Sequence, residues 1–206
     1  MTRAEQKLKS RRKLLDATID IIASEGLDSV TFAKVSRYAG LSRGLCSFHF
    51  ETKDQLMLEA LRMLYKKYEM AWRSALTESV AAPENRLASM IKVLLSQPIA
   101  DPKALAVLVA YWGVAPHRKT YLELFTESDL AYEESIEEVM RALANGREVI
   151  NGMSLRAIAV MLTSMIDGIH VQYLIAPGHL SYEEGVQGCL TFLANFFPQF
   201  ISIMDQ

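Results

Sequence analysis

Residues 31–50, TFAKVSRYAGLSRGLCSFHF, combine two hydroxyl side chains, a glycine between them and several basic and aromatic side chains. Thr31 and Ser42 are residue types that cap helix N-termini, and Gly40 between them can adopt the left-handed conformation that ends a helix. The segment therefore predicts two short helices joined by a glycine turn. Such a helix-turn-helix can place its second helix in a DNA major groove.

Arg43 is the first side chain of the expected second helix, where an arginine can bond O6 and N7 of one guanine together. Gly44 would let the backbone approach DNA closely, and Ser47 lies one turn after Arg43 on the same side. We expect Arg43 to contact a base or a phosphate. We expect Phe48 and Phe50 to lie mainly in the core, because a small three-helix unit needs aromatic filling.

Thr31 and Ser42 have a second possible role besides capping. Free backbone N–H groups at a helix N-terminus suit a phosphate, so both caps are candidate DNA contacts. Lys34 takes the place where a capping box would have glutamate, which adds a positive charge near the same helix start.

Charge is distributed unevenly along this chain, whose formal net charge is −2. Residues 1–55 carry 10 Lys and Arg against 7 Asp and Glu, whereas residues 56–206 carry 12 against 17. A basic N-terminal end on an acidic protein fits a polyanion partner for that end alone, although a solvated terminus would show the same excess. The acidic remainder argues against a general architectural nucleic-acid protein.

The composition excludes several other classes. Two cysteines, Cys46 and Cys189, are too few for a disulfide framework and fit no metal spacing. The sequence contains no HExxH, P-loop or GxSxG motif, so we expect no catalytic residues, no cofactor and no metal site. No apolar run reaches the ~18 residues of a spanning helix, and the charged N-terminus does not resemble a signal peptide. We expect a cytoplasmic protein without a membrane partner.

Helical periodicity extends over the whole chain, and the fold class we predict is all-α with about nine helices and no strand. The expected helices cover about residues 4–24, 31–39, 43–48, 52–80, 84–97, 103–112, 117–144, 154–176 and 181–197. The helix at 103–112 is apolar almost all round and should be buried. Residues 1–50 form the helix-turn-helix domain and 51–206 a larger bundle, with the helix at about 52–80 connecting the two.

The N-terminal third resembles the TetR family of bacterial transcriptional regulators. The resemblance is carried by Gly26-Leu27, residues 31–35 (TFAKV), residues 39–44 (AGLSRG), residues 48–50 (FHF) and residues 52–56 (TKDQL). It implies a ligand-controlled repressor that binds a palindromic double-stranded DNA operator as a homodimer. It also implies that His49 and Lys53 contact phosphates.

Residues 51–206 would then be the ligand-sensing and dimerisation domain. A pair of helices from each subunit, at about 154–176 and 181–197, would form the dimer interface as in that family. Both helices carry long apolar stripes, which would alternatively fill the core of a single chain.

The C-terminal part is similar to the choline-responsive repressors of betaine synthesis within that family. The shared features are Tyr111-Trp112 with His117 behind them, residues 166–168 (IDG), and Ser47. This similarity implies choline or a related quaternary ammonium compound as effector. The alternative is the same family with an unrelated hydrophobic or aromatic effector.

The candidate ligand-binding residues are an acid and a set of rings: Tyr111, Trp112, Tyr121, Phe125, Asp167, His170 and Tyr173. Asp167 lies in an otherwise apolar stretch, where a carboxylate is costly unless paired. It would bond a helix end, pair with an arginine such as Arg118, or meet a cationic ligand. Aromatic faces with a carboxylate suit a quaternary ammonium, although ordinary core aromatics with a paired aspartate would give the same pattern.

Overall fold

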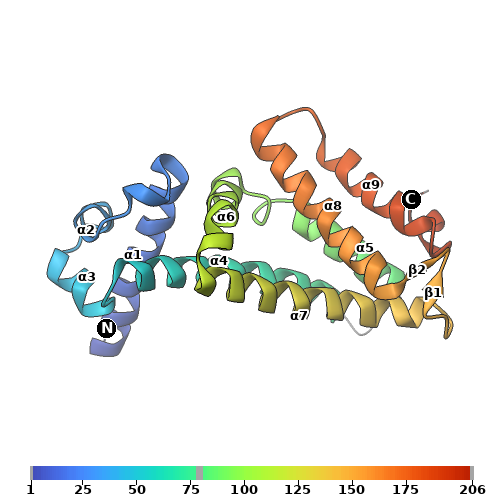
Figure 1. Cartoon of the computed structure of the whole chain (residues 1–206), viewed down its shortest axis with the longest axis horizontal. Helices are drawn as coiled ribbons and strands as arrows, with labels where there is room; N and C mark the ends of the chain where they lie inside the picture. Colours follow the sequence, from blue (N-terminus) through green and yellow to red (C-terminus); the bar gives the residue numbers. More distant parts are fainter. Residues whose placement is uncertain (1, 78–80, 205–206) are drawn as a thin grey trace. The chain divides into compact units, whose positions relative to one another are not determined.

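The computed structural model of this 206-residue chain describes residues 2–77 and 81–204. Within these residues it contains ten α-helices, two short 3-10 helices and one small two-stranded hairpin (Figure 1). The predicted all-α class is confirmed. The chain divides into two compact units, residues 1–66 with 103–124 and residues 67–102 with 125–206, which we call unit 1 and unit 2. This division differs from the functional boundary expected at residue 50, which stays a prediction.

Unit 1 is built on α1 (Arg3–Glu25), which packs against both α2 (Phe32–Ala39) and α3 (Arg43–His49). The 3-10 turn η1 (Leu27–Ser29) connects α1 to α2. The first turns of α4 (Lys53–Leu76), most of α6 (Pro102–Val114), η2 (Ala115–His117) and the start of α7 (Lys119–Leu143) complete the unit. Its buried residues include Leu14, Ile21, Ile22, Val30, Val35, Cys46, Phe50, Leu56, Leu61, Leu105, Val107 and Tyr111.

Hydroxyl side chains mark most of the helix starts. Thr31 and Ser42 accept hydrogen bonds from the N–H groups of Lys34 and Leu45, both at 3.2 Å, as predicted. Thr52 likewise accepts from Gln55 N–H at 3.1 Å. The Gln55 side chain, however, accepts from Glu51 N–H at 2.7 Å and not from the Thr52 N–H that a capping box requires.

Unit 2 contains α5 (Pro83–Leu95), α8 (Leu155–Ile175), α9 (Tyr182–Ala194) and α10 (Gln199–Met204). These four helices pack around one core together with the second halves of α4 and α7. By length and composition α8 would suffice to cross a membrane. It also supplies buried residues such as Leu155, Ile158 and Leu162 to this core, which accounts for its apolar character.

A hairpin between α7 and α8 is a feature that the sequence interpretation missed. Strands β1 (Val149–Ile150) and β2 (Met153–Ser154) pair antiparallel across Asn151 and Gly152. Both turn residues have positive φ, +49° and +81°, as an Asn-Gly hairpin turn requires. The expectation of no strand was wrong here because each strand is too short to show alternation.

Three helix predictions also need correction. The helix at 103–112 is only partly buried, because Leu105, Val107 and Tyr111 are the buried residues of α6 and the others keep solvent contact. The last helix stops at Ala194, and a separate α10 follows Pro198. The helix predicted to 80 ends at Leu76, and residues 78–80 lie outside the described part of the chain.

Two stacked tyrosines in unit 1 give a matched test of the packing. The rings of Tyr111 and Tyr121 are both buried and lie 5.1 Å apart, edge to face. Tyr111 donates a hydrogen bond to the Met57 carbonyl at 2.7 Å, whereas the Tyr121 hydroxyl has no partner among the described residues. We expect Tyr111→Phe to lower the free energy of unfolding by about 1 kcal/mol, and Tyr121→Phe to leave it unchanged or raise it. Urea denaturation followed by circular dichroism measures both, and equal losses would contradict this assignment.

Candidate functional site

The first candidate site is the turn between α2 and α3 in unit 1. Gly40 has φ +64°, and the following N–H, of Leu41, donates to Ser36 O at 2.9 Å, which closes the end of α2. The chain reaches the Ser42 cap two residues later and starts α3 there. The predicted helix-turn-helix geometry is therefore present, with α2 and α3 packed on each other and on α1.

The outward face of α3 consists of Arg43, Gly44, Ser47 and Phe48, all of which are exposed. Positions i, i+1, i+4 and i+5 form one continuous strip on a helix. Arg43 has no hydrogen-bond or ion-pair partner among the described residues, so its guanidinium is available to an external acceptor. A Cβ added to Gly44 would meet no atom within 4 Å, so the packing of this chain does not require glycine there.

Three other predicted DNA contacts have partners within the chain. Lys34 forms an ion pair with Glu25, and that lysine lowers the pKa of the Glu25 carboxyl. His49 Nε2 lies 2.7 Å from Ser10 Oγ, and Lys53 Nζ donates to Asp28 O at 3.4 Å. Desolvation, together with nearby positive charge, lowers the pKa of His49, which favours a neutral ring at pH 7.

Phe48 and Phe50 differ sharply in environment. Phe50 is 1% exposed and belongs to the core of unit 1, as predicted. Phe48 is 65% exposed, so the expectation that it fills the core was wrong. The reason is helical register, because Cys46 and Phe50 take the inward positions and leave Phe48 beside Gly44 and Ser47 on the outer strip.

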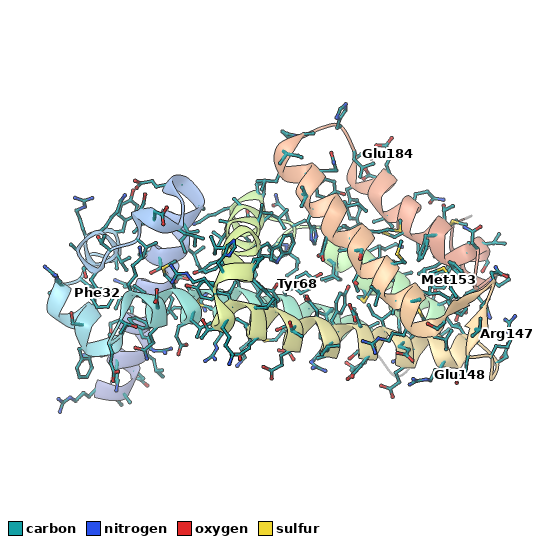
Figure 2. The ribbon with its side chains drawn as sticks, viewed as in Figure 1. Phe32, Tyr68, Arg147, Glu148, Met153 and Glu184 are labelled. Carbon is teal, nitrogen blue, oxygen red and sulfur yellow. The ribbon has the colours of Figure 1, made fainter. Side chains whose placement is uncertain are left out.

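The second candidate site is an aromatic and acidic cluster in unit 2. Tyr132 of α7 lies between two rings of α4, with centroids 5.9 Å from Tyr68 and 5.1 Å from Trp72. The ring of Tyr68, labelled in Figure 2, also lies edge to face with the ring of His170 of α8, and the two ring centroids are 6.4 Å apart. Tyr132 is 5% exposed, and its hydroxyl has no hydrogen bond of normal geometry among the described residues, although a side-chain interaction with Tyr68 acts to lower its pKa. A buried hydroxyl without a partner is costly and needs an explanation.

Two carboxylates lie within electrostatic reach of the Tyr132 hydroxyl. Desolvation raises the pKa of Asp167 to about 7, with repulsion from Asp129 as the second cause. Desolvation, followed by repulsion from Glu133, raises the pKa of Asp129 to about 6. Both side chains are nevertheless exposed at the surface, and neither has an ion pair or hydrogen bond among the described residues. The cluster therefore combines negative charge, aromatic rings and solvent access without a counter-ion from the chain.

The ligand-binding residues expected from sequence belong partly to unit 1 and partly to unit 2. Tyr111, Trp112 and Tyr121 belong to unit 1, where the Trp112 indole N–H donates to the Tyr65 hydroxyl at 3.3 Å. Arg118 also lies in unit 1 and pairs with Asp54 at 3.3 Å, so it does not serve as the partner suggested for Asp167.

The remaining four candidates, Phe125, Asp167, His170 and Tyr173, belong to unit 2. His170 donates from Nε2 to the Leu94 carbonyl at 2.9 Å, and desolvation lowers its pKa. The neutral ring therefore connects α8 to α5 by a hydrogen bond. The Tyr173 hydroxyl donates to Ser181 O at 3.4 Å, and Phe125 is buried in α7. Asp167 is the member of the original set that lies in the charged cluster.

Sequence reasoning missed Tyr68, Trp72, Asp129 and Tyr132 as members of this cluster. Spacing offered a weak signal, because Tyr68 and Trp72 are four residues apart and Asp129 and Tyr132 are three apart, so each pair shares a helix face. Nothing in the sequence indicated that these two faces meet Asp167 of α8.

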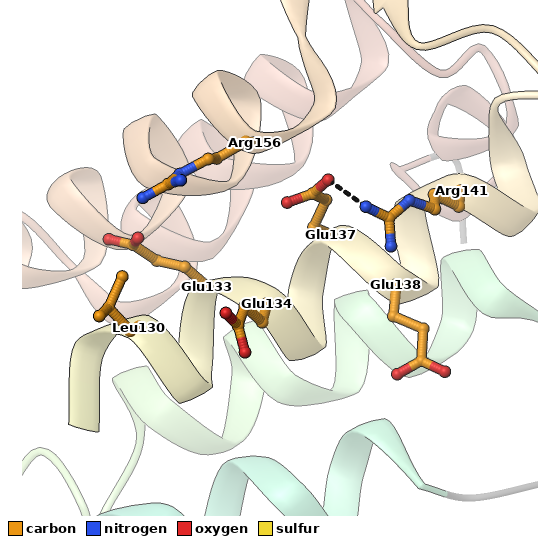
Figure 3. Close-up of a pocket in the computed structure, with 7 residues that line it drawn as sticks. All are labelled: Leu130, Glu133, Glu134, Glu137, Glu138, Arg141 and Arg156. Carbon is orange, nitrogen blue, oxygen red and sulfur yellow. Dashed lines mark hydrogen bonds and ion pairs between the residues drawn. The ribbon is translucent and has the colours of Figure 1, made fainter. Parts of the chain in front are cut away.

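An acidic groove of about 460 Å³ lies along α7 in the same unit (Figure 3). Its lining residues are Leu130, Glu133, Glu134, Glu137, Glu138, Arg141 and Arg156. Arg141 neutralises Glu137 through a 2.5 Å contact. Glu133, in the lining of the groove, repels the Asp129 carboxylate and raises its pKa, so the groove and Asp129 share one negative field. The field along α7 is therefore attractive to cations near the aromatic cluster.

One exposed face of α8, beside the exposed Asp167, and the exposed face of α9 beyond Glu183 and Glu184 carry no charged side chain, and we call these two surfaces the uncharged outer faces. The exposed residues of these faces are Met161, Ser164, Gly168, Gln172 and Ile175 on α8, and Gln187, Gly188 and Thr191 on α9, with Asn195 at its C-cap. The apolar stripe of the helix expected at 181–197 consists of Val186, Leu190, Leu193 and Phe197, and all four are buried in the core of unit 2.

The fold and the turn between α2 and α3 define a helix-turn-helix DNA-binding protein. Residues 14–60 match the family described as bacterial regulatory proteins, tetR family. Residues 83–198, more than half of the chain, match the C-terminal domain of BetI-type transcriptional repressors. The chain belongs to the TetR family, with a BetI-type C-terminal domain, and is a DNA-binding transcription regulator and not an enzyme.

Individual relatives agree with this assignment. The HTH-type transcriptional regulator BetI of Rhizobium meliloti (strain 1021) is 24% identical over 176 residues, which cover 85% of this chain and 83% of that protein. A transcriptional regulator from Pseudomonas aeruginosa PAO1 has a similar fold, with TM-score 0.82, 22% identity and coverage of 97% of this chain and 96% of that one. A regulator from Saccharomonospora viridis, solved in complex with choline, has TM-score 0.74 and 22% identity, with coverage of 89% and 94%.

The raised pKa of Asp167 predicts a pH dependence of stability. Because its folded pKa of about 7 exceeds the ordinary 3.8, the folded protein retains a proton that the unfolded chain releases, and stability falls as pH rises from about 4 to about 7. We expect Asp167→Asn to be more stable than wild type at pH 8, with the difference shrinking towards pH 4. Urea unfolding at several pH values measures this. The control Glu127→Gln removes an exposed carboxylate from α7, and parallel curves for Asp167→Asn and wild type would refute the prediction.

Proposed function

We propose that this protein is a ligand-responsive repressor that binds a palindromic operator as a homodimer. Binding of an organic cation to unit 2 would release the operator or alter the protein's affinity for it. The observation that carries the proposal is the pair of uncompensated carboxylates beside buried rings in a BetI-type domain. As a regulator of this kind, the protein would act in the cytoplasm.

DNA binding is assigned to the outer strip of α3. Arg43 is the unpaired cation at its start, and we propose that it reads a guanine edge. Ser47, His49, Lys53, Lys34 and the two caps Thr31 and Ser42 remain the proposed set of further contacts. Lys34, His49 and Lys53 would have to exchange or share their internal partners on binding.

Dimerisation is assigned to the uncharged outer faces of α8 and α9. A Cβ at Gly168 or Gly188 would meet no atom within 4 Å in this chain. Glycine at an exposed helical position lowers helix stability, so its presence on both faces supports close approach of a second pair of helices. A two-fold dimer would present two α3 helices to half-sites about one helical turn apart.

The effector class follows from the chemistry of the cluster in unit 2. Desolvated rings attract a cation through their faces, and a quaternary ammonium is the ligand class that aromatic cages commonly bind. Asp129 and Asp167 would supply the counter-charge, and the Tyr132 hydroxyl would donate a hydrogen bond to a polar end of the ligand. The choline complex of the Saccharomonospora viridis regulator supports choline as the first compound to test. An unrelated hydrophobic or aromatic effector is the alternative.

Operator binding is tested with duplexes chosen by in vitro selection, followed by gel shift and sedimentation. We expect two chains per palindromic site. Arg43→Ala should weaken binding by at least about tenfold, the loss of one bidentate base contact. Gly44→Ala should fold more stably, by roughly 0.5–1 kcal/mol, yet bind DNA more weakly because its methyl group points outward. Wild-type affinity in Arg43→Ala would show that another helix reads the operator.

Effector binding is tested by calorimetry with choline and with its neutral isostere 3,3-dimethylbutan-1-ol. We expect choline to bind and to weaken operator binding, and the isostere to bind about tenfold more weakly or worse, because the cation–π and ionic attractions are lost. Asp167→Asn should reduce choline affinity by a similar factor.

Two substitutions test which set of aromatic residues binds the effector: Tyr68→Leu alters the cluster in unit 2, and Trp112→Ala alters the set expected from sequence. Loss of choline binding in Tyr68→Leu alone supports the cluster in unit 2, and loss in Trp112→Ala alone supports the residues expected from sequence. Equal affinity for choline and its isostere, or heat from neither, would contradict a cationic effector without affecting the assignment of DNA binding.

A further inference from the structure

Phe48 is an exposed aromatic side chain that core packing does not explain. It is 65% exposed, although a phenylalanine ring has no polar atom that benefits from water. Its neighbours on the α3 strip are polar or small, so it does not extend a larger apolar patch of that helix. Isolated exposed apolar residues are common on protein surfaces. Its position distinguishes it, because it lies on the exposed strip of the proposed DNA-reading helix, in the last turn of α3.

The ring is held in place from two sides. Lys7 Nζ of α1 lies 5.2 Å from the ring centroid, and the His49 ring contacts it edge to face at 5.3 Å. His49 is itself fixed by Ser10 of α1 at 2.7 Å. A side chain restrained before binding loses less conformational entropy when it contacts a partner. Lys7 also places a positive charge beside the ring, which suits the phosphates that flank a groove.

The α3 strip leaves the ring open to a base edge. Gly44 lies one turn before Phe48 and has no side chain, so nothing on that side of the helix screens the ring. Without a hydroxyl, Phe48 forms no hydrogen bond to a phosphate or to a base. The one apolar group that the major groove offers is the C5-methyl group of thymine, which phenylalanine can contact.

We propose that Phe48 is a specificity-determining residue that packs against a thymine methyl group in each operator half-site. This inference rests on the proposed role of α3 in DNA binding. It adds a second readout beside Arg43: the arginine recognises guanine by hydrogen bonds, and the ring recognises thymine by apolar contact. Both side chains project from the same strip of one short helix.

The test is a uracil scan of the selected operator. Each thymine is replaced by deoxyuridine, which removes only the methyl group and keeps base pairing. We expect one position in each half-site where this replacement weakens wild-type binding about fourfold, the effect of one buried methyl group. Phe48→Ala should bind the unmodified operator correspondingly more weakly and be insensitive to uracil at that position. Phe48→Leu should keep part of the sensitivity, since an apolar side chain remains.

Controls distinguish the possible failures. Leu122→Ala removes another exposed apolar side chain of unit 1 and should leave the uracil scan unchanged. Wild-type binding that is insensitive to uracil at every thymine overturns the inference while the operator assignment stands. Equal sensitivity in Phe48→Ala also overturns it, because another residue then contacts the methyl group. If wild type selects no operator at all, the proposed function fails and this inference fails with it.

Discussion

A hydrogen bond from a first-turn backbone N–H to a serine or threonine hydroxyl determines where most of the helices begin. Thr2, Thr31, Ser42, Thr52, Ser154 and Ser181 all accept such a bond within the described residues. Each bond satisfies one of the four N–H groups that a helix start leaves unpaired. Because helical side chains repeat every 3.6 residues, the cap fixes the register of the helix, and packing against neighbouring helices then decides which face turns inward.

The consequence is greatest for α3, which has only seven residues. With its start set at Ser42, the two inward positions go to Cys46 and Phe50, and the outward strip begins at Arg43. A shift of one residue would bury Ser47 and expose Cys46. The side chains available to DNA therefore depend on this cap, on the left-handed turn at Gly40 before it, and on the packing of α3 against α1 and α2.

In unit 2 the main constraint is the electrostatic cost of two carboxylates, Asp129 and Asp167. Desolvation and repulsion from a neighbouring carboxylate, Glu133 for Asp129 and Asp129 for Asp167, make their charged forms costly, and the chain supplies no counter-ion for either among the described residues. Such an arrangement reduces stability, and proteins tolerate it mainly at sites that bind something. A bound cation would remove the cost in one conformation more than in another, and that difference in affinity is what a ligand-controlled switch requires.

By itself the sequence determined the all-α class, the helix starts, the helix-turn-helix and the family, because caps, glycine turns and helical periodicity are local signals. It also marked Asp167 as anomalous, since a carboxylate in an apolar run is visible without coordinates. Only the tertiary structure decided that Phe48 is exposed while Phe50 is buried, and that Tyr68, Trp72 and Tyr132 gather near Asp167. These outcomes depend on which faces of distant helices meet, and no residue spacing within one helix contains that information.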